Sequence, residues 1–300
     1  MIECDLEIQK PDVNWMGNVT YEKHLLSDYN VFTQDIIIQS IKRSFNFSKT
    51  DVSNTRFFTG ATDESRTITV PFFTYDKYIH NFQLVRDDLY GLFGDDIIYI
   101  RELRNGEYAT GKQYQVYLSE IIEPKQSYKF SEGALVFETA ESPYARSILS
   151  TAELEEKGIL AEGDWSYGMG LKLVNDDVPK YSFKMVPNKK CHVLNAGNIN
   201  VDPYEQKLRI EITEIVFKNN GDKGQLNIYN DTNNSHLVFW LDKKVEKIVI
   251  DDTMIYFDGF NAKIGDTGFL ELKKGVNELM LSDYEIESLK ISLDFYFEYR

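Results

Sequence analysis

Sites for metal ions and for covalent chemistry need residues that this chain has in small number. It contains two cysteines, Cys4 and Cys191, and four histidines among its 300 residues. The cysteines lie far apart in the sequence, and a chain of this length buries enough core to fold without a disulfide. We therefore expect two free thiols and synthesis in a cytoplasm.

The sequence also lacks long apolar runs and a surplus of basic residues. It has no run of 18 apolar residues, and residues 1–10 hold acidic side chains without an apolar segment, so we expect neither a membrane span nor a secretory signal. The formal net charge is −15, with both halves of the chain acidic. Because nucleic-acid binding needs clustered Lys and Arg, we expect no nucleic-acid partner.

Motifs that mark catalytic sites are missing as well. The sequence has no G-x-S-x-G, no HExxH, no P-loop and no G-x-G-x-x-G after a strand. The histidines, at positions 24, 80, 192 and 236, include no pair at the spacing of helical metal ligands. Cys191 and His192 are adjacent, which in a strand turns them to opposite faces. We expect no catalytic residue, no cofactor and no metal site.

Acid pairs and exposed aromatic residues are the remaining candidates for chemistry. Glycoside hydrolysis uses two carboxylates, which Asp87–Asp88 or Asp251–Asp252 could supply, but a chain with 48 acidic residues contains such pairs by chance and a solvated surface explains them. A sugar-binding face could use Trp240, Tyr256, Phe257 and Phe260. The alternative is core packing, because Phe239 and Trp240 are adjacent in an apolar strand and one of them must point inward.

The aromatic share of 14%, mostly 19 Tyr and 19 Phe, favours strands over helices. Alternation predicts a strand over Ile36–Phe47, with Ile41, Arg43, Phe45 and Phe47 on one face, and another over Thr67–Phe73. Between them, Lys49–Glu64 is rich in Ser, Thr, Asn, Asp and Gly, which indicates a long hairpin connection or an extended arm.

Helical spacing of apolar residues predicts one short helix over Leu84–Phe93, stopped by Gly94. Strands follow at Ile97–Arg101, Gln113–Ile122 and Gly133–Thr139. We expect a first domain over 1–147 and an irregular crossover region over 148–200, packed on one of the domains because it is rich in both glycine and aromatic residues.

The last hundred residues predict a second domain, 201–300, made of short strands separated by turns. Six to eight closely spaced strands are typical of a β-sandwich or jelly roll. In the final strand, Ile291, Leu293, Phe295 and Phe297 share one face. The strand candidates are Lys207–Phe217, Gln225–Tyr229, His236–Leu241, Glu246–Asp251, Met254–Phe257, Gly268–Leu272, Glu278–Leu281 and Ser288–Tyr299.

Several short motifs follow one another in an order that resembles a known family. In the first half they are Arg66–Phe72, Arg86–Phe93, Tyr99–Arg101, Tyr114–Leu118, Val136–Thr139 and Ser142–Ala145. In the second half they are Asn195–Asn198 with Pro203, Ile228–Thr232, Phe269–Leu279 and Phe295–Arg300. As a set they are similar to the distal tail proteins of long, flexible-tailed phages that infect Gram-positive bacteria.

This resemblance implies a mainly β fold, with an N-terminal ring-forming (belt) domain followed by a galectin-like β-sandwich. It implies a hexameric ring at the tail tip of the virion, without catalysis. The ring would lie beneath the tail tube protein and carry the tail-associated lysin or fibre and the receptor-binding proteins. Neighbouring first domains would associate by strand pairing and apolar burial, with the 49–64 segment as the candidate arm.

Two other functions stay open on the sequence alone. A carbohydrate-binding adhesion protein would contact host cell-wall polysaccharide through its sandwich, and would need coplanar exposed aromatic residues. A cell-wall hydrolase would need acidic side chains or a metal site that converge in a cleft.

Overall fold

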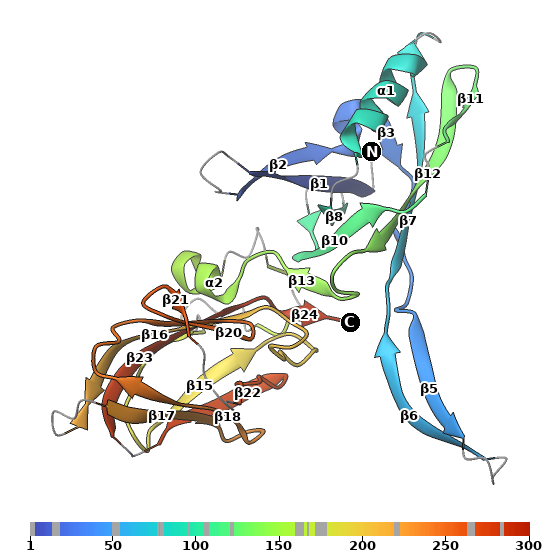
Figure 1. The fold of residues 1–300 in the computed structure, drawn as a ribbon. Helices are drawn as coiled ribbons and strands as arrows, with labels where there is room; N and C mark the ends of the chain where they lie inside the picture. The colour runs from blue at the N-terminus through green and yellow to red at the C-terminus, as the bar shows by residue number, and fades with distance from the viewer. Residues whose placement is uncertain are drawn as a thin grey trace. The chain divides into compact units, whose positions relative to one another are not determined.

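A computed structural model of the protein describes residues 4–13, 19–49, 55–76, 78, 81–94, 97–104, 108–120, 123–159, 165–166, 168–171, 179–218, 223–262, 268–282 and 285–300. The chain divides into two compact units, Met1–Ala145 together with Arg300, and Arg146–Tyr299. Both consist mainly of antiparallel strands, which confirms the predicted fold class (Figure 1).

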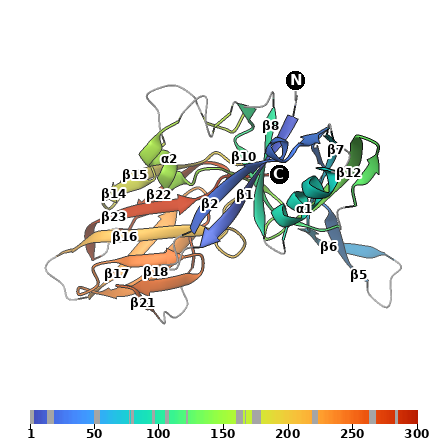
Figure 2. The same ribbon diagram turned by 90° about the horizontal axis from the view of Figure 1, so that it is seen from above.

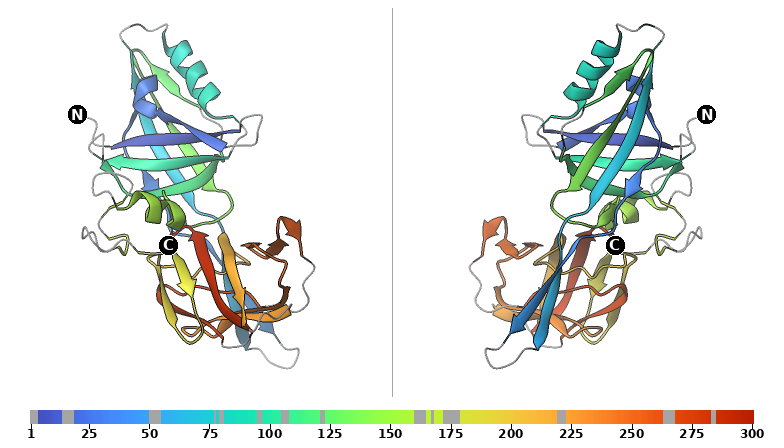
Figure 3. Two further views of the ribbon diagram at one scale, coloured as in Figure 1. Left: turned by 90° about the vertical axis from the view of Figure 1, so that its left-hand side faces the viewer. Right: turned by 90° about the vertical axis from the view of Figure 1, so that its right-hand side faces the viewer.

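The first unit is built on one curled antiparallel sheet. Its strands follow the order β2 (Val19–Leu25), β1 (Cys4–Val13), β8 (Ile98–Arg104), β10 (Lys112–Leu118), β12 (Phe130–Thr139), β7 (Thr67–Tyr75) and β3 (Val31–Thr33). Short strands β4 (Ile37–Ile38), β9 (Tyr108–Ala109) and β11 (Lys125–Ser127) extend β7, β8 and β12, and the 3-10 helix η1 (Leu26–Tyr29) links β2 to β3. Strands β1 and β8 cross the direction of β7 and β12, so the sheet folds over its own core (Figure 3).

The core of the first unit follows from strict alternation in β7 and β12. Ile68, Val70 and Phe72 of β7 are fully buried, and Leu135 and Phe137 of β12 lie on the same side. Helix α1 (Phe82–Leu92) packs its apolar stripe on this core. The predicted helix is therefore confirmed, beginning two residues earlier than expected.

The prediction of one strand over Ile36–Phe47 is wrong. The segment contains β4 and then β5 (Arg43–Lys49), separated by residues 39–42. The chain changes partner there, since β4 pairs with β7 whereas β5 pairs only with β6 (Arg56–Asp63). The strand is interrupted where its pairing partner changes. The alternation of apolar residues in the sequence gives no sign of that change.

The second unit is a sandwich of two antiparallel sheets. The larger sheet has the order β14 (Ser182–Met185), β23 (Ile286–Phe295), β16 (Leu208–Phe217), β19 (Ile248–Asp251), β20 (Met254–Phe257) and β21 (Phe260–Asn261). The smaller has the order β15 (Lys190–Asn195), β22 (Gly275–Leu281), β17 (Lys223–Asn230) and β18 (Ser235–Asp242). Strand β23 is central, between β14 and β16 (Figure 2). The prediction of one strand over Ser288–Tyr299 is wrong, because β23 ends at Phe295 and a separate strand, β24 (Glu298–Tyr299), follows.

An aromatic cluster fills the core of the second unit. The ring of Tyr181 lies 5.8 Å from that of Phe295 and 6.4 Å from that of Phe297, and Trp165 contacts Phe297 at 5.9 Å. The Tyr181 hydroxyl donates to the carbonyl of Leu194 at 2.9 Å, which satisfies the polar end of the buried ring. Near the cluster, β13 (Ala145–Ser147) pairs with β24 (Glu298–Tyr299).

The region predicted as an irregular crossover, 148–200, contains regular elements. It holds helix α2 (Thr151–Lys157) and strands β14 and β15. Ser150 and Glu153 form a capping box at the start of α2, a signal that the sequence carried and the prediction missed. The predicted strand Gly268–Leu272 is wrong, because there Leu272 makes only an isolated bridge with Val201. The division into three segments stays a prediction.

Close approach of two strands explains one glycine. Gly133 in β12 lies opposite Phe72 in β7, and a methyl group added at Gly133 would lie 2.7 Å from the Phe72 ring. Because Phe72 is fully buried, its ring has no space into which to retreat. We expect Gly133→Ala to lower the free energy of unfolding by about 1–3 kcal/mol, measured by chemical denaturation.

The matched control is Gly91→Ala in α1, where an added methyl group meets nothing within 4 Å. That change should be neutral or raise the stability by up to about 1 kcal/mol, because alanine favours the helix. Equal effects of the two substitutions would contradict the steric explanation.

Candidate functional site

Cysteines and histidines are dispersed over the described parts of the chain. Burial raises the pKa of the Cys4 thiol to about 11, and burial also raises the pKa of Cys191, so both stay protonated at neutral pH. His24 bonds the Tyr29 hydroxyl at 2.8 Å, and His80 lies outside the described residues. No group of three potential metal ligands occurs among the residues that were placed.

The acid pairs serve local structure. Asp252 accepts a hydrogen bond from the Leu208 amide at 2.9 Å, while Asp251 faces Arg209 at 3.8 Å. Asp87 accepts two bonds from its neighbour Arg86. In both pairs the described contacts are to neighbouring protein groups, and they do not arrange the two carboxylates around a substrate site for glycoside hydrolysis.

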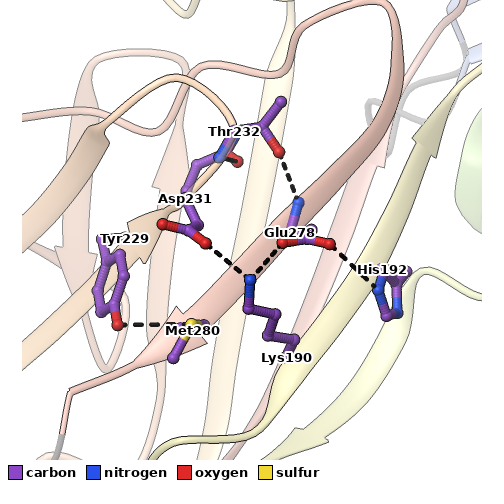
Figure 4. Close-up of polar contacts among 8 residues, drawn as sticks. Lys190, His192, Tyr229, Asp231, Thr232, Glu278 and Met280 are labelled. Carbon is purple, nitrogen blue, oxygen red and sulfur yellow. Dashed lines mark hydrogen bonds and ion pairs between the residues drawn. The ribbon is translucent and has the colours of Figure 1, made fainter.

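The most connected ionic cluster lies on the outer side of the smaller sheet of the second unit (Figure 4). The ammonium group of Lys190 lies 2.7 Å from Asp231 and 2.5 Å from Glu278, and His192 lies 3.7 Å from Glu278. Hydrogen bonds from the lysine to Asp231 and Glu278 raise the pKa of Lys190. The cluster joins β15 and β22 to the turn after β17, a structural role that consumes both carboxylates.

The four aromatic residues considered for sugar binding do not form one face. Trp240 is 66% exposed on β18, and its neighbour Phe239 points inward, in contact with Phe257. Phe260 is 81% exposed but belongs to β21 of the other sheet. Tyr256 is half-buried. Trp240 alone therefore remains as an exposed aromatic candidate on the smaller sheet.

The candidate functional site is the hairpin of β5 and β6, which we call the arm. It pairs with no other sheet in the described structure and extends from the end of the first unit opposite α1 (Figure 1). The predicted segment Lys49–Glu64 supplies its second strand, and residues 50–54 lie outside the described part. The sequence left open a long hairpin connection or an extended arm, and the structure shows a projecting β-hairpin in which Arg56–Asp63, not predicted as a strand, forms β6.

The arm exposes four phenylalanines. Phe58 contacts Phe45 at 6.4 Å and Phe47 at 5.9 Å between ring centres, so these three rings share one face. They are 55–60% exposed, and Phe57 is 53% exposed. An isolated two-stranded hairpin is marginally stable in water, and a group of exposed apolar rings is a candidate contact surface for another molecule.

Asp63 closes the base of the arm. Its carboxylate accepts a hydrogen bond from Arg43 Nε at 2.5 Å and from the Tyr144 hydroxyl at 2.7 Å, and it pairs with Arg300. Burial acts to raise the pKa of Asp63, but the bonds from Arg43 and Tyr144 outweigh it and hold that pKa below its usual value.

A carboxylate with a lowered pKa in the folded state stabilises the fold above its unfolded pKa of about 4, and the contribution is lost as the pH falls through the folded value. We expect Asp63→Asn to cost about 1–3 kcal/mol of unfolding free energy at pH 7. The difference from the wild type should shrink as the pH falls below about 4, measured by chemical denaturation. The exposed Asp88→Asn serves as control; a pH-independent deficit in Asp63→Asn would contradict this account.

No protein-family model matches the chain, and no curated protein matches it. Among solved structures, the Dit protein of phage SPP1, presented as a paradigm of the hub adsorption apparatus in phages that infect Gram-positive bacteria, matches with a TM-score of 0.58 at 12% identity. The match covers 97% of this chain and 99% of that one. The two chains share a fold over nearly their whole length, which confirms the predicted resemblance in fold.

Two structures of the phage P2 baseplate in its activated conformation, with Ca and with Sr, match with TM-scores of 0.41 and 0.40 at 9% and 10% identity. These matches cover 97% and 96% of this chain, and 98% and 97% of the baseplate chains. Within the described residues, no helix is both long and apolar enough to cross a membrane.

Proposed function

We propose that this chain is a non-enzymatic structural protein of a phage tail tip, located in the virion. Six copies form a ring beneath the tail tube protein. The ring is the hub on which the tail-associated lysin or fibre and the receptor-binding proteins are mounted.

The observation that carries the proposal is the common fold with the SPP1 Dit protein from end to end. A match limited to the sandwich would support little, because sandwiches serve many functions. Here the correspondence includes both units in one chain, 97% of its length. The ring size of six comes from the family that the sequence resembles.

The arm supports a function in assembly. Covering the side chains of Phe45, Phe47 and Phe58 would gain about 1.5–3 kcal/mol for each ring that is fully removed from water. The two strands of the arm also leave outer edges with unpaired backbone groups, which another chain can extend. A neighbouring copy is the partner we assign, since a closed ring needs the same contact between every pair of neighbours.

The mass of the protein in solution tests the ring. Light scattering after size exclusion, over a range of protein and salt concentrations, should reveal a closed species of six copies. Apolar burial at the arm predicts that this species persists at high salt, because salt screens ion pairs and does not weaken hydrophobic contacts.

The adhesion alternative predicts a different result, and the exposed Trp240 is the observation that favours it. A monomer at every concentration that binds host cell-wall polysaccharide, and loses that binding in Trp240→Ala, would contradict the hub proposal.

The arm has its own test. We expect the triple variant Phe45→Ser, Phe47→Ser, Phe58→Ser to keep the unfolding midpoint of the monomer, because the three rings are already exposed. Subunit association should weaken by at least about 100-fold, from the lost burial of three rings. Sedimentation velocity measures the fractions of monomer and of assembled ring.

Trp240→Ser is the matched control, since it removes an equally exposed aromatic side chain from the second unit. It should leave association unchanged. Normal ring formation by the triple arm variant would show that the arm is not the contact between subunits.

A further inference from the structure

The arm is a long hairpin attached at one end, so a small rotation at its base moves its far end by a large distance. Its strands hold seven and eight residues, which at about 3.3 Å per residue gives a length of about 25 Å. A rotation of about 10° at the base therefore moves the far end by about 4 Å, more than the tolerance of a packed interface. Something at the base has to hold the direction of the arm.

Most contacts at the base join the arm to itself. The Glu64 amide donates to the Lys42 carbonyl at 2.8 Å, and the side chains of the same two residues form an exposed ion pair at 2.8 Å. These contacts keep the two chains of the base together. The segment that follows β6 is also held to the sheet, because Ser65 donates to Glu138 and Thr139 accepts the amide of Arg66, but neither bond involves a residue of the arm itself.

Asp63 is different because two of its three partners, Tyr144 and Arg300, come from outside the arm. It is the last residue of β6, its side chain is 9% exposed, and Tyr144 and Arg300 are 81 and 237 residues away in the sequence. The Arg300 guanidinium also lies over the Tyr144 ring at 5.8 Å, so the two donors brace each other. All three residues belong to the first unit.

The carboxylate is well suited to this role. One oxygen accepts from Arg43 across the hairpin, and the other accepts from Tyr144 and Arg300. Charge-assisted bonds of this kind are roughly twice as strong as neutral ones and fix direction when they converge on one group. The Asp63 side chain is 9% exposed, whereas Arg43 and Arg300 are 43% and 48% exposed, so salt partly screens the two ion pairs and the bond from Tyr144 is the better protected one.

We propose that Asp63 is the positioning residue of the arm, which fixes the angle at which the arm leaves the first unit. Its effect on assembly rests on the proposed function, in which the arm contacts a neighbouring copy. Its effect on the direction of the arm is independent of the proposed function.

Pulsed electron paramagnetic resonance on the full-length chain tests the proposal. Spin labels at Ser48→Cys in the arm and Glu132→Cys in β12, in a Cys191→Ser background, report the distance between arm and sheet in a dilute monomer. We expect one narrow distance distribution in the parent protein. In Asp63→Asn, which loses the charge but keeps the size, the width should increase at least about twofold.

A second variant removes the donors and retains the carboxylate. Tyr144→Phe combined with Arg300→Ala should broaden the distribution as Asp63→Asn does, and adding Asp63→Asn to it should have little further effect, since the three residues act as one unit. Glu64→Gln is the matched control. It breaks the neighbouring ion pair with Lys42 and should leave the distribution narrow.

Circular dichroism confirms that each variant is folded before the distances are compared. Narrow distributions in both Asp63→Asn and the double variant would overturn the proposal, whatever their oligomeric state. A monomeric parent protein with a broad distribution in Asp63→Asn would overturn the hub proposal and leave the positioning role intact. If both hold, Asp63→Asn should also need at least about fivefold more protein to form the ring, and Glu64→Gln should not.

Discussion

The pairing of β7 with β12 is the interaction on which the first unit depends. Nine residue pairs join these strands, from Thr67 opposite Glu138 to Tyr75 opposite Phe130. The Phe72 ring lies over Gly133 in the middle of the ladder. Because β7 connects the arm to the segment that enters α1, this one ladder sets the position of both ends of the unit. The base of the arm is attached to the same ladder, where Thr139 accepts the amide of Arg66 and Ser65 donates to Glu138.

Polar side chains in both units are used to hold neighbouring segments in place. In the first unit, Asp63 collects three donors at the base of the arm. In the second, Lys190 joins two carboxylates across the surface of the smaller sheet (Figure 4). Such arrangements consume the charges that an active site would leave available to a substrate. In the arm, by contrast, four exposed phenylalanine rings are available for apolar contact.

In the proposed ring, a folded sheet with a projecting apolar hairpin would suit repeated assembly. The sheet and its core keep the subunit folded before it meets a neighbour, and the net charge of −15 opposes unspecific association of free copies. In that proposal the exposed Phe cluster supplies apolar burial when a neighbouring copy binds. The direction of the arm decides which surface of the partner it can reach.

The sequence by itself determined the elements whose signal is local. Alternation in Thr67–Phe73 and in Ile291–Phe295 identified strands that are buried in the two cores, and helical spacing identified α1. Composition alone indicated either a long hairpin connection or an extended arm at 49–64. These features follow from which side chains tolerate water at each position, and neighbouring residues carry that information.

Only the tertiary structure decided what depends on distant partners. Strands β14 and β15 lie in a segment that reads as irregular, and they form because β23 and β22, about a hundred residues later, offer their edges. The break between β4 and β5 exists because the two strands have different neighbours. The meeting of Asp63 with Tyr144 and Arg300 had no sequence signal, since their proximity results from the packing of the whole first unit and not from spacing along the chain.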